Sequence, residues 1–199
     1  MNKKGAFICI EGLDGCGKTT QAKLLAKKLG KSHNAVYTAE PSRGKIGTYI
    51  RNSYLYGEKR LSSVIEALLF AADRIEHIET EVLPTLKQGK LVISDRYVYS
   101  SLAYQGAAGL SLGWIEKINE NALRPDLAVF IDVDPKTAIH RLKSNKSVME
   151  NMETQEKVRK IYWEFIEKGI LTRINGDQPK NEVAKELYAV VIKFLNASR

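Results

Sequence analysis

Short apolar runs alternate along the chain with longer stretches in which apolar residues recur at helical spacing. The apolar runs predict strands at residues 7–10, 35–38, 91–93, 127–133 and 170–174. Because the runs are continuous rather than alternating, we expect strands that are covered on both faces. The helical spacing predicts helices at residues 19–29, 61–87, 135–142 and 181–195. Strands that alternate with helices are typical of βαβ units, so the sequence predicts an α/β fold with a five-stranded, mostly parallel sheet flanked by helices.

Local signals refine three of these segments. Gly30 follows the first helical pattern and is expected to end that helix after Leu29. Pro84 lies near the end of the long pattern at 61–87 and is expected to bend it. The segment 143–154 is polar, poor in core residues and free of Gly and Pro. It is either a surface turn that leads into a further helix or a mobile lid over a site.

Length and composition agree with a single domain over residues 1–199. Of the 199 residues, 44% are hydrophobic, which is enough for a sizeable core. No apolar run approaches the ~18 residues that a membrane-spanning helix needs, and the run after the basic start is too short for a signal peptide. Cys9 and Cys16 are too distant to bridge if Cys9 lies in an extended strand. We therefore expect free thiols in a cytoplasmic protein with no membrane partner.

Basic residues outnumber acidic ones, and the formal net charge is +8. Such a charge favours a polyanionic partner such as a nucleotide, a nucleic acid or an acidic membrane surface. Lys and Arg are nevertheless scattered along the chain, and only Lys23, Lys27, Lys28 and Lys31 gather on and just after one predicted helix. A solvated helix face explains that group, so we expect no nucleic-acid partner.

Residues 12–19 read GLDGCGKT and match the phosphate-binding pattern G-x-x-x-x-G-K-[ST]. A predicted strand precedes the pattern and a predicted helix follows it, as phosphate binding by a helix N-terminus requires. Lys18 can reach the terminal phosphates, and the Thr19 hydroxyl can bind Mg²⁺. A dinucleotide fingerprint is excluded because Thr20 stands where its third glycine should be. The expected ATP-binding residues are Gly12, Asp14, Gly15, Cys16, Gly17, Lys18, Thr19 and Thr20.

The residues after the third predicted strand indicate which reaction the bound nucleotide serves. A guanine-reading Asn-Lys-x-Asp motif is absent, because residues 145–148 read NKSV. Asp95 ends a buried strand, where it can either hold Mg²⁺ together with Thr19 or cap the next helix. Arg96 follows directly, and an arginine at that position suits a second bound anion.

Five motifs, in order, resemble those of thymidylate kinases. They are EGLDGCGKTT at 11–20, Glu-Pro at 40–41, LFAADR at 69–74, DRYVYSSLAYQ at 95–105 and RPDL at 124–127, which leads into 131–133. The resemblance covers most of the chain. It implies a P-loop kinase three-layer fold with a short lid at about 141–154, and transfer of the ATP γ-phosphoryl group to dTMP with Mg²⁺, giving ADP and dTDP. It also implies a homodimer.

The resemblance implies roles for individual residues. The catalytic residues would be Lys18, Asp95, Arg96 and Arg141. The dTMP site would contain Asp14, Glu40, Arg43, Phe70, Arg74, Arg96, Ser100, Tyr104 and Gln105. In this scheme arginines 43, 74 and 96 hold the dTMP phosphate, and Phe70 stacks on thymine. Tyr104 lies against the sugar, Gln105 reads the edge of the base, and Glu40 engages the water shell of Mg²⁺.

The sequence departs from the family pattern at its catalytic arginine. The family places an arginine in the P-loop or in the lid, whereas residues 14–16 and 142–158 contain none. Either Arg141 or Arg159 reaches in, or Lys143 or Lys146 supplies the positive charge. Two other functions stay open: another nucleoside monophosphate or deoxynucleoside kinase, and a non-enzymatic ATP-binding module that acts on nucleic acid.

Overall fold

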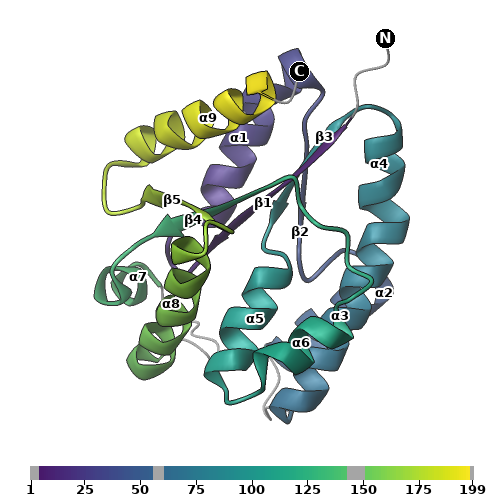
Figure 1. Cartoon of the computed structure of the whole chain (residues 1–199), viewed down its shortest axis with the longest axis vertical. Helices are drawn as coiled ribbons and strands as arrows, with labels where there is room; N and C mark the ends of the chain where they lie inside the picture. Colours follow the sequence, from purple (N-terminus) through teal and green to yellow (C-terminus); the bar gives the residue numbers. More distant parts are fainter. Residues whose placement is uncertain (1–4, 56–60, 143–150, 198–199) are drawn as a thin grey trace.

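A five-stranded parallel sheet forms the centre of the molecule, with strand order β2-β3-β1-β4-β5 (Figure 1). The computed structural model describes residues 5–55, 61–142 and 151–197. The strands are β1 (Ala6–Gly12), β2 (Val36–Ala39), β3 (Leu91–Asp95), β4 (Leu127–Asp132) and β5 (Thr172–Asn175). Every pair of neighbouring strands is parallel, so the predicted α/β fold is confirmed and its sheet is wholly parallel.

Helices cover both faces of the sheet and make the predicted three layers. The α-helices are α1 (Lys18–His33), α2 (Lys45–Tyr49), α3 (Ser63–His77), α4 (Leu83–Lys87), α5 (Val98–Ala107), α6 (Leu112–Ile118), α7 (Pro135–Arg141), α8 (Met152–Glu167) and α9 (Lys180–Ala197). Two π-helical turns, η1 (Ile50–Leu55) and η2 (Ile78–Val82), extend α2 and α3. Helices α1 and α9 pack together on one face, and α5 packs between α3 and α8 on the other (Figure 1).

The register of the sheet sets the position of the site. Ile10 of β1 lies beside Asp95 of β3, and Ala39 of β2 lies beside the same aspartate. The carboxyl ends of the three strands therefore meet at one edge, where ligands bind in open parallel sheets. Phe7 and Ile10 are both 0% exposed, as expected of a strand that is covered on both faces.

Two predicted helix boundaries are wrong for local reasons. The first helix continues through Gly30 to His33, because the left-handed turn that ends it is made by Asn34, with φ 50°. The pattern at 61–87 divides into α3, η2 and α4, and Pro84 lies in the first turn of α4. A proline has no N–H to donate to the preceding helical turn. The regular α-helix is therefore interrupted by the wider turns of η2, which lie before α4.

The sequence prediction gave no range for four helices, namely α2, α5, α6 and α8, although a further helix after 143–154 was one of its alternatives. Residues 100–105 of α5 are all buried, so this helix has no polar face and no amphipathic spacing to detect. Helix α8 follows the segment 143–150, which lies outside the described residues. Its first turn is fixed by Asn151, whose side chain accepts a hydrogen bond from the Thr154 amide at 2.8 Å.

Both cysteines are free and buried, which confirms the predicted free thiols. Burial raises the pKa of the Cys16 thiol, although the charge of Lys18 opposes this shift. Cys16 lies under Gly12, where an added Cβ would come within 2.5 Å of its sulfur. Its role is therefore to fill the space below the loop. In the described ranges, no helix has both the length and the apolar character needed to cross a membrane.

Candidate active site

The loop between β1 and α1 has the backbone that a phosphate cradle needs. Gly15 and Gly17 adopt φ values of 83° and 93°, a region that suits glycine. An added Cβ on Gly15 would lie 2.1 Å from the carbonyl oxygen of Ala138, so α7 packs directly on the loop. Lys18 is 6% exposed, and its ammonium donates to the Leu13 carbonyl at 3.0 Å. The predicted ATP-binding residues thus form one loop at the N-terminus of α1.

The two predicted metal ligands, Thr19 and Asp95, meet beside this loop. The Thr19 hydroxyl donates to Asp95 Oδ2 at 2.5 Å, and the Tyr37 hydroxyl lies 3.4 Å from the same oxygen. Asp95 Oδ1 is buried and has no hydrogen-bond partner among the residues that the structure describes. Hydroxyl and carboxylate oxygens suit Mg²⁺, which binds few protein groups because phosphates and waters complete its shell. The two predicted metal ligands therefore fit the ion.

The P-loop aspartate joins the loop to α5. Arg96 donates to Asp14 and also to the Ser100 hydroxyl, at 3.0 Å in the second case. The Tyr104 hydroxyl donates to Asp14 Oδ2 at 2.9 Å and accepts from the Asp14 amide at 3.1 Å. Burial would raise the pKa of Asp14, but the charges of Arg96 and Lys18 outweigh it and hold that pKa below its usual value. Asp14 is therefore a carboxylate that fixes Arg96 and Tyr104, two residues of the predicted dTMP site.

A second carboxylate lies beneath this cluster. Glu11 is 0% exposed and accepts from the Ser100 hydroxyl at 2.6 Å, the Tyr162 hydroxyl at 2.9 Å and the Tyr97 amide at 2.9 Å. Burial raises its pKa to about 7, and the Ser100 hydrogen bond and the Arg96 charge oppose this shift. The sequence prediction gave Glu11 no role. The available signal was a charged residue at the end of an apolar strand.

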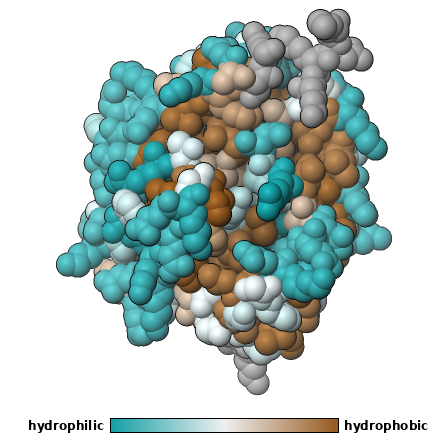
Figure 2. Space-filling model, viewed as in Figure 1, coloured by the Kyte–Doolittle hydropathy of each residue, from teal (hydrophilic) through white to brown (hydrophobic). Residues whose placement is uncertain are grey.

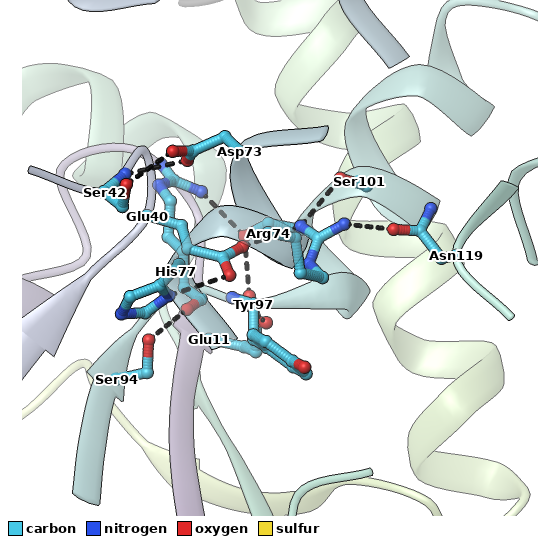
Figure 3. Close-up of polar contacts among 12 residues, drawn as sticks. Glu11, Glu40, Ser42, Asp73, Arg74, His77, Ser94, Tyr97, Ser101 and Asn119 are labelled. Carbon is cyan, nitrogen blue, oxygen red and sulfur yellow. Dashed lines mark hydrogen bonds and ion pairs between the residues drawn. The ribbon is translucent and has the colours of Figure 1, made fainter. Parts of the chain in front are cut away.

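Arg74 forms a buried ion pair with Glu40 (Figure 3). Its Nη2 donates to Glu40 at 2.7 Å and to Ser101 at 3.1 Å, and its Nη1 donates to Asn119. On the other side of Glu40, the His77 ring lies 3.2 Å away. Arg74 is 1% exposed, so its guanidinium faces protein acceptors here rather than solvent. Ser101, Asn119 and His77 were not predicted as site residues.

The turn after β2 is bound to α3, the helix that carries Arg74. Asp73 accepts from the Ser42 amide at 2.8 Å and from the Ser42 hydroxyl at 2.6 Å. This carboxylate fixes the turn that carries Arg43. Arg43 is exposed and lines a pocket of about 320 Å³ together with Lys23, Tyr37 and Arg51. Of the arginines predicted at the dTMP phosphate, Arg43 and Arg96 thus retain solvent access, whereas Arg74 does not.

The predicted base-reading residues lie on two helices that pack together. Phe70 is half-buried on α3, one turn before Arg74. Gln105 of α5 is 2% exposed, and its carbonyl oxygen has no hydrogen-bond partner within the described ranges. A buried amide oxygen without a partner is costly, so a donor from a ligand would satisfy it. Helices α3 and α5 are in contact, which brings the two residues to the same part of the fold.

The two arginines proposed for the lid have different surroundings. Arg141 is partly exposed and lies 3.5 Å from the Gly176 carbonyl and 3.8 Å from Asp177. Arg159 donates twice to the buried Asp132, at 2.8 and 3.2 Å. Arg159 thus compensates a buried charge, and Arg141 is the freer of the two. Lys143 and Lys146, the lysine alternatives, lie outside the described residues.

The tertiary structure gathers most of the predicted residues into two clusters. The first surrounds the P-loop and contains Asp14, Lys18, Thr19, Asp95, Arg96, Ser100 and Tyr104. The second contains Glu40 and Arg74. Neither cluster includes the other predicted residues Arg43, Phe70, Gln105 and Arg141.

A P-loop, an aspartate at the end of the neighbouring strand and an arginine directly after that aspartate place the chain among the P-loop nucleotide kinases. Comparison with known proteins narrows this class. A family model described as thymidylate kinase matches residues 10–187. The chain belongs to the thymidylate kinase family.

Individual relatives match most or nearly all of this chain. A probable thymidylate kinase of Pyrococcus abyssi is 45% identical over 198 residues, which cover 94% of this chain and 96% of the relative. A probable thymidylate kinase of Pyrobaculum calidifontis is 40% identical over 195 residues, which cover 97% of this chain and 99% of the relative. A probable thymidylate kinase of Methanococcus maripaludis strain C7 is 48% identical over 167 residues.

Proposed function

We propose that this chain transfers the γ-phosphoryl group of ATP to dTMP, producing ADP and dTDP in the synthesis of nucleotides. The observation that carries the proposal is the bonding of Asp14, in the P-loop, to Arg96 and Tyr104 on the acceptor side. This contact joins the donor and acceptor halves of the site, as an in-line transfer between two bound anions requires. We also propose a cytoplasmic location, which the two free thiols favour.

On the donor side, the P-loop amides and Lys18 would hold the ATP phosphates. Thr19 and Asp95 would hold Mg²⁺, whose chemistry is to neutralise charge that develops on the transferred phosphoryl group. We propose that residues 141–154 form the lid of a single domain. Arg141 would supply its positive charge, because α7 packs on Gly15 of the loop and because Arg159 is bound to Asp132.

On the acceptor side, Arg96 and Arg43 would hold the dTMP phosphate, and a guanidinium suits this task because it can donate two parallel hydrogen bonds. For Arg74 to join them it would have to release Glu40, so its phosphate role stays a prediction. Phe70 would stack on thymine, and Gln105 would read its edge. Tyr104 and Ser100 would border the sugar and base, and Glu40 would face the magnesium waters.

The test is a panel of phosphoryl acceptors. ADP formation from ATP and Mg²⁺ should be fastest with dTMP and slower with dUMP, which lacks the methyl group of thymine. We expect dCMP, dGMP, AMP, UMP and thymidine to give little or no product. If ADP formation is fastest with an acceptor other than dTMP, the proposed roles of Phe70, Tyr104 and Gln105 are rejected. If no acceptor stimulates ADP formation, the kinase proposal itself is rejected, and a salt titration of DNA binding then tests the binding-module alternative.

The exposed face of α3 supports a homodimer. Val64, Ile65 and Leu68 are 43%, 46% and 47% exposed, which is unusual for neighbouring apolar side chains on one helix. Figure 2 shows apolar side chains gathered at the lower edge of the view, where α3 begins. We propose that a second copy of the chain covers this face, so that two α3 helices pack together.

A charge placed on this face should separate the two copies. We expect Leu68→Asp to convert the dimer to a monomer in analytical ultracentrifugation, because two buried carboxylates would face each other across a two-fold axis. The matched control is Glu79→Gln, an exposed position of the adjoining η2, which should leave the mass unchanged. A wild-type chain that sediments as a monomer at micromolar concentration would reject the dimer.

A further inference from the structure

Glu11 is a buried acid that accepts three hydrogen bonds beneath the site. It lies near the carboxyl end of β1 and is 0% exposed. A carboxylate is costly to bury, and it is retained in a core only where donors compensate it. Here the donors are the Ser100 hydroxyl, the Tyr162 hydroxyl and the Tyr97 amide. Two of these three donors also hold Arg96.

The first connection runs through the backbone. Arg96 has φ 72°, in the left-handed region that a non-glycine residue rarely adopts. The surrounding bonds must therefore fix this conformation. The Arg96 amide donates to the Ile10 carbonyl at 3.0 Å, and the Ser94 hydroxyl donates to the Arg96 carbonyl at 2.7 Å. The next amide, that of Tyr97, donates to Glu11 at 2.9 Å.

The second connection runs through the side chain. Ser100 Oγ lies 2.6 Å from Glu11 and 3.0 Å from Nη1 of Arg96. An ionised carboxylate can only accept, so the Ser100 hydroxyl hydrogen points toward Glu11. This leaves the lone pairs of the same oxygen for the guanidinium. The other end of the guanidinium is bound by Asp14, so Arg96 lies between two carboxylates, one in direct contact and one acting through a hydroxyl.

We propose that Glu11 is a positioning residue that holds the backbone and the guanidinium of Arg96 in the orientation needed for phosphoryl transfer. The proposal rests on the proposed function for the identity of the reaction. Glu11 itself touches neither nucleotide, because it is wholly buried beneath the loop. Its effect should therefore pass through Arg96 and disappear when the Arg96 side chain is removed.

Kinetics of Glu11→Gln test this dependence. Glutamine has the same shape but carries a neutral amide, which cannot accept from all three donors at once. We expect kcat with dTMP to fall by about 10- to 100-fold, because small errors in orientation have effects of this size, while KM for ATP changes by less than about twofold. In an Arg96→Ala background the same substitution should change kcat by less than about twofold. Equal losses in both backgrounds would overturn the proposal.

A matched control separates positioning from general damage to β1. Asp126 also holds this strand through a carboxylate, by accepting from the Phe7 amide at 2.8 Å at the opposite end. Asp126→Asn should leave kcat within about twofold of wild type, because no hydrogen bond among the residues that the structure describes connects Asp126 to Arg96. If Glu11→Gln does not fold, Ser100→Ala replaces it, since this change removes only the bridging hydroxyl. We expect the same loss of kcat and the same dependence on Arg96.

A second readout needs no substrate. The Nε–H resonance of Arg96 can be followed by NMR and identified through its loss in Arg96→Lys. In wild type it should be a sharp signal of a fixed side chain, and in Glu11→Gln it should shift and broaden. An unchanged resonance would overturn the positioning role even if the acceptor panel had rejected dTMP. An inactive wild type with the expected NMR change would instead reject only the proposed reaction.

Discussion

Replacing Lys18 by methionine should reduce dTMP-dependent ADP formation by at least about 10³-fold, which corresponds to ~4 kcal/mol of transition-state stabilisation. The ammonium lies over the P-loop, 3.0 Å from the Leu13 carbonyl and 3.6 Å from Asp14. It is the only cation on α1 that is buried among the described residues of that helix. Methionine keeps the length of the side chain but removes the charge that would bind the transferring phosphoryl group.

A control on the same helix isolates the effect of position. Lys27 is exposed two turns further along α1, and Lys27→Met should leave the rate within about twofold of wild type. Circular dichroism should show that both variants are folded. A Lys18→Met enzyme that retains more than a tenth of the wild-type rate would show that Lys18 does not stabilise the transition state.

Replacing Arg74 by methionine should lower the free energy of unfolding by about 3–5 kcal/mol, measured by urea denaturation. Arg74 is 1% exposed, and its removal leaves the Glu40 carboxylate buried without its main counter-charge. It also removes the donors that bind Ser101 and Asn119. The loss is large because the charge that remains cannot reach water.

The double variant Arg74→Met with Glu40→Gln tests this explanation. It removes both charges, so it should recover part of the stability that the single variant loses. We expect it to be more stable than Arg74→Met alone by at least about 1 kcal/mol. If the free energy of unfolding of Arg74→Met lies within about 1 kcal/mol of the wild-type value, the ion pair contributes little to stability.

The sequence and the tertiary structure contributed different parts of the site. The P-loop was readable because its glycines, Lys18 and Thr19 are adjacent in the chain and lie between a strand and a helix. Asp95 was readable for the same reason, as the last residue of an apolar strand. Helix α5 was not, because it is buried on nearly every side and has no polar face to give a period. The boundary at His33 was missed because Asn34, rather than the nearby Gly30, adopts the left-handed turn.

By itself, the sequence determined the parallel α/β class, the phosphate-binding loop and the resemblance to one kinase family, since each depends on neighbours in the chain. Only the tertiary structure decided which side chains share a partner. Ser100 and Tyr162 lie 89 and 151 positions from Glu11, yet both donate to its carboxylate. Arg74 likewise meets Glu40 across 34 positions. Burial and pairing of charge arise from packing between distant segments, and no local pattern records them.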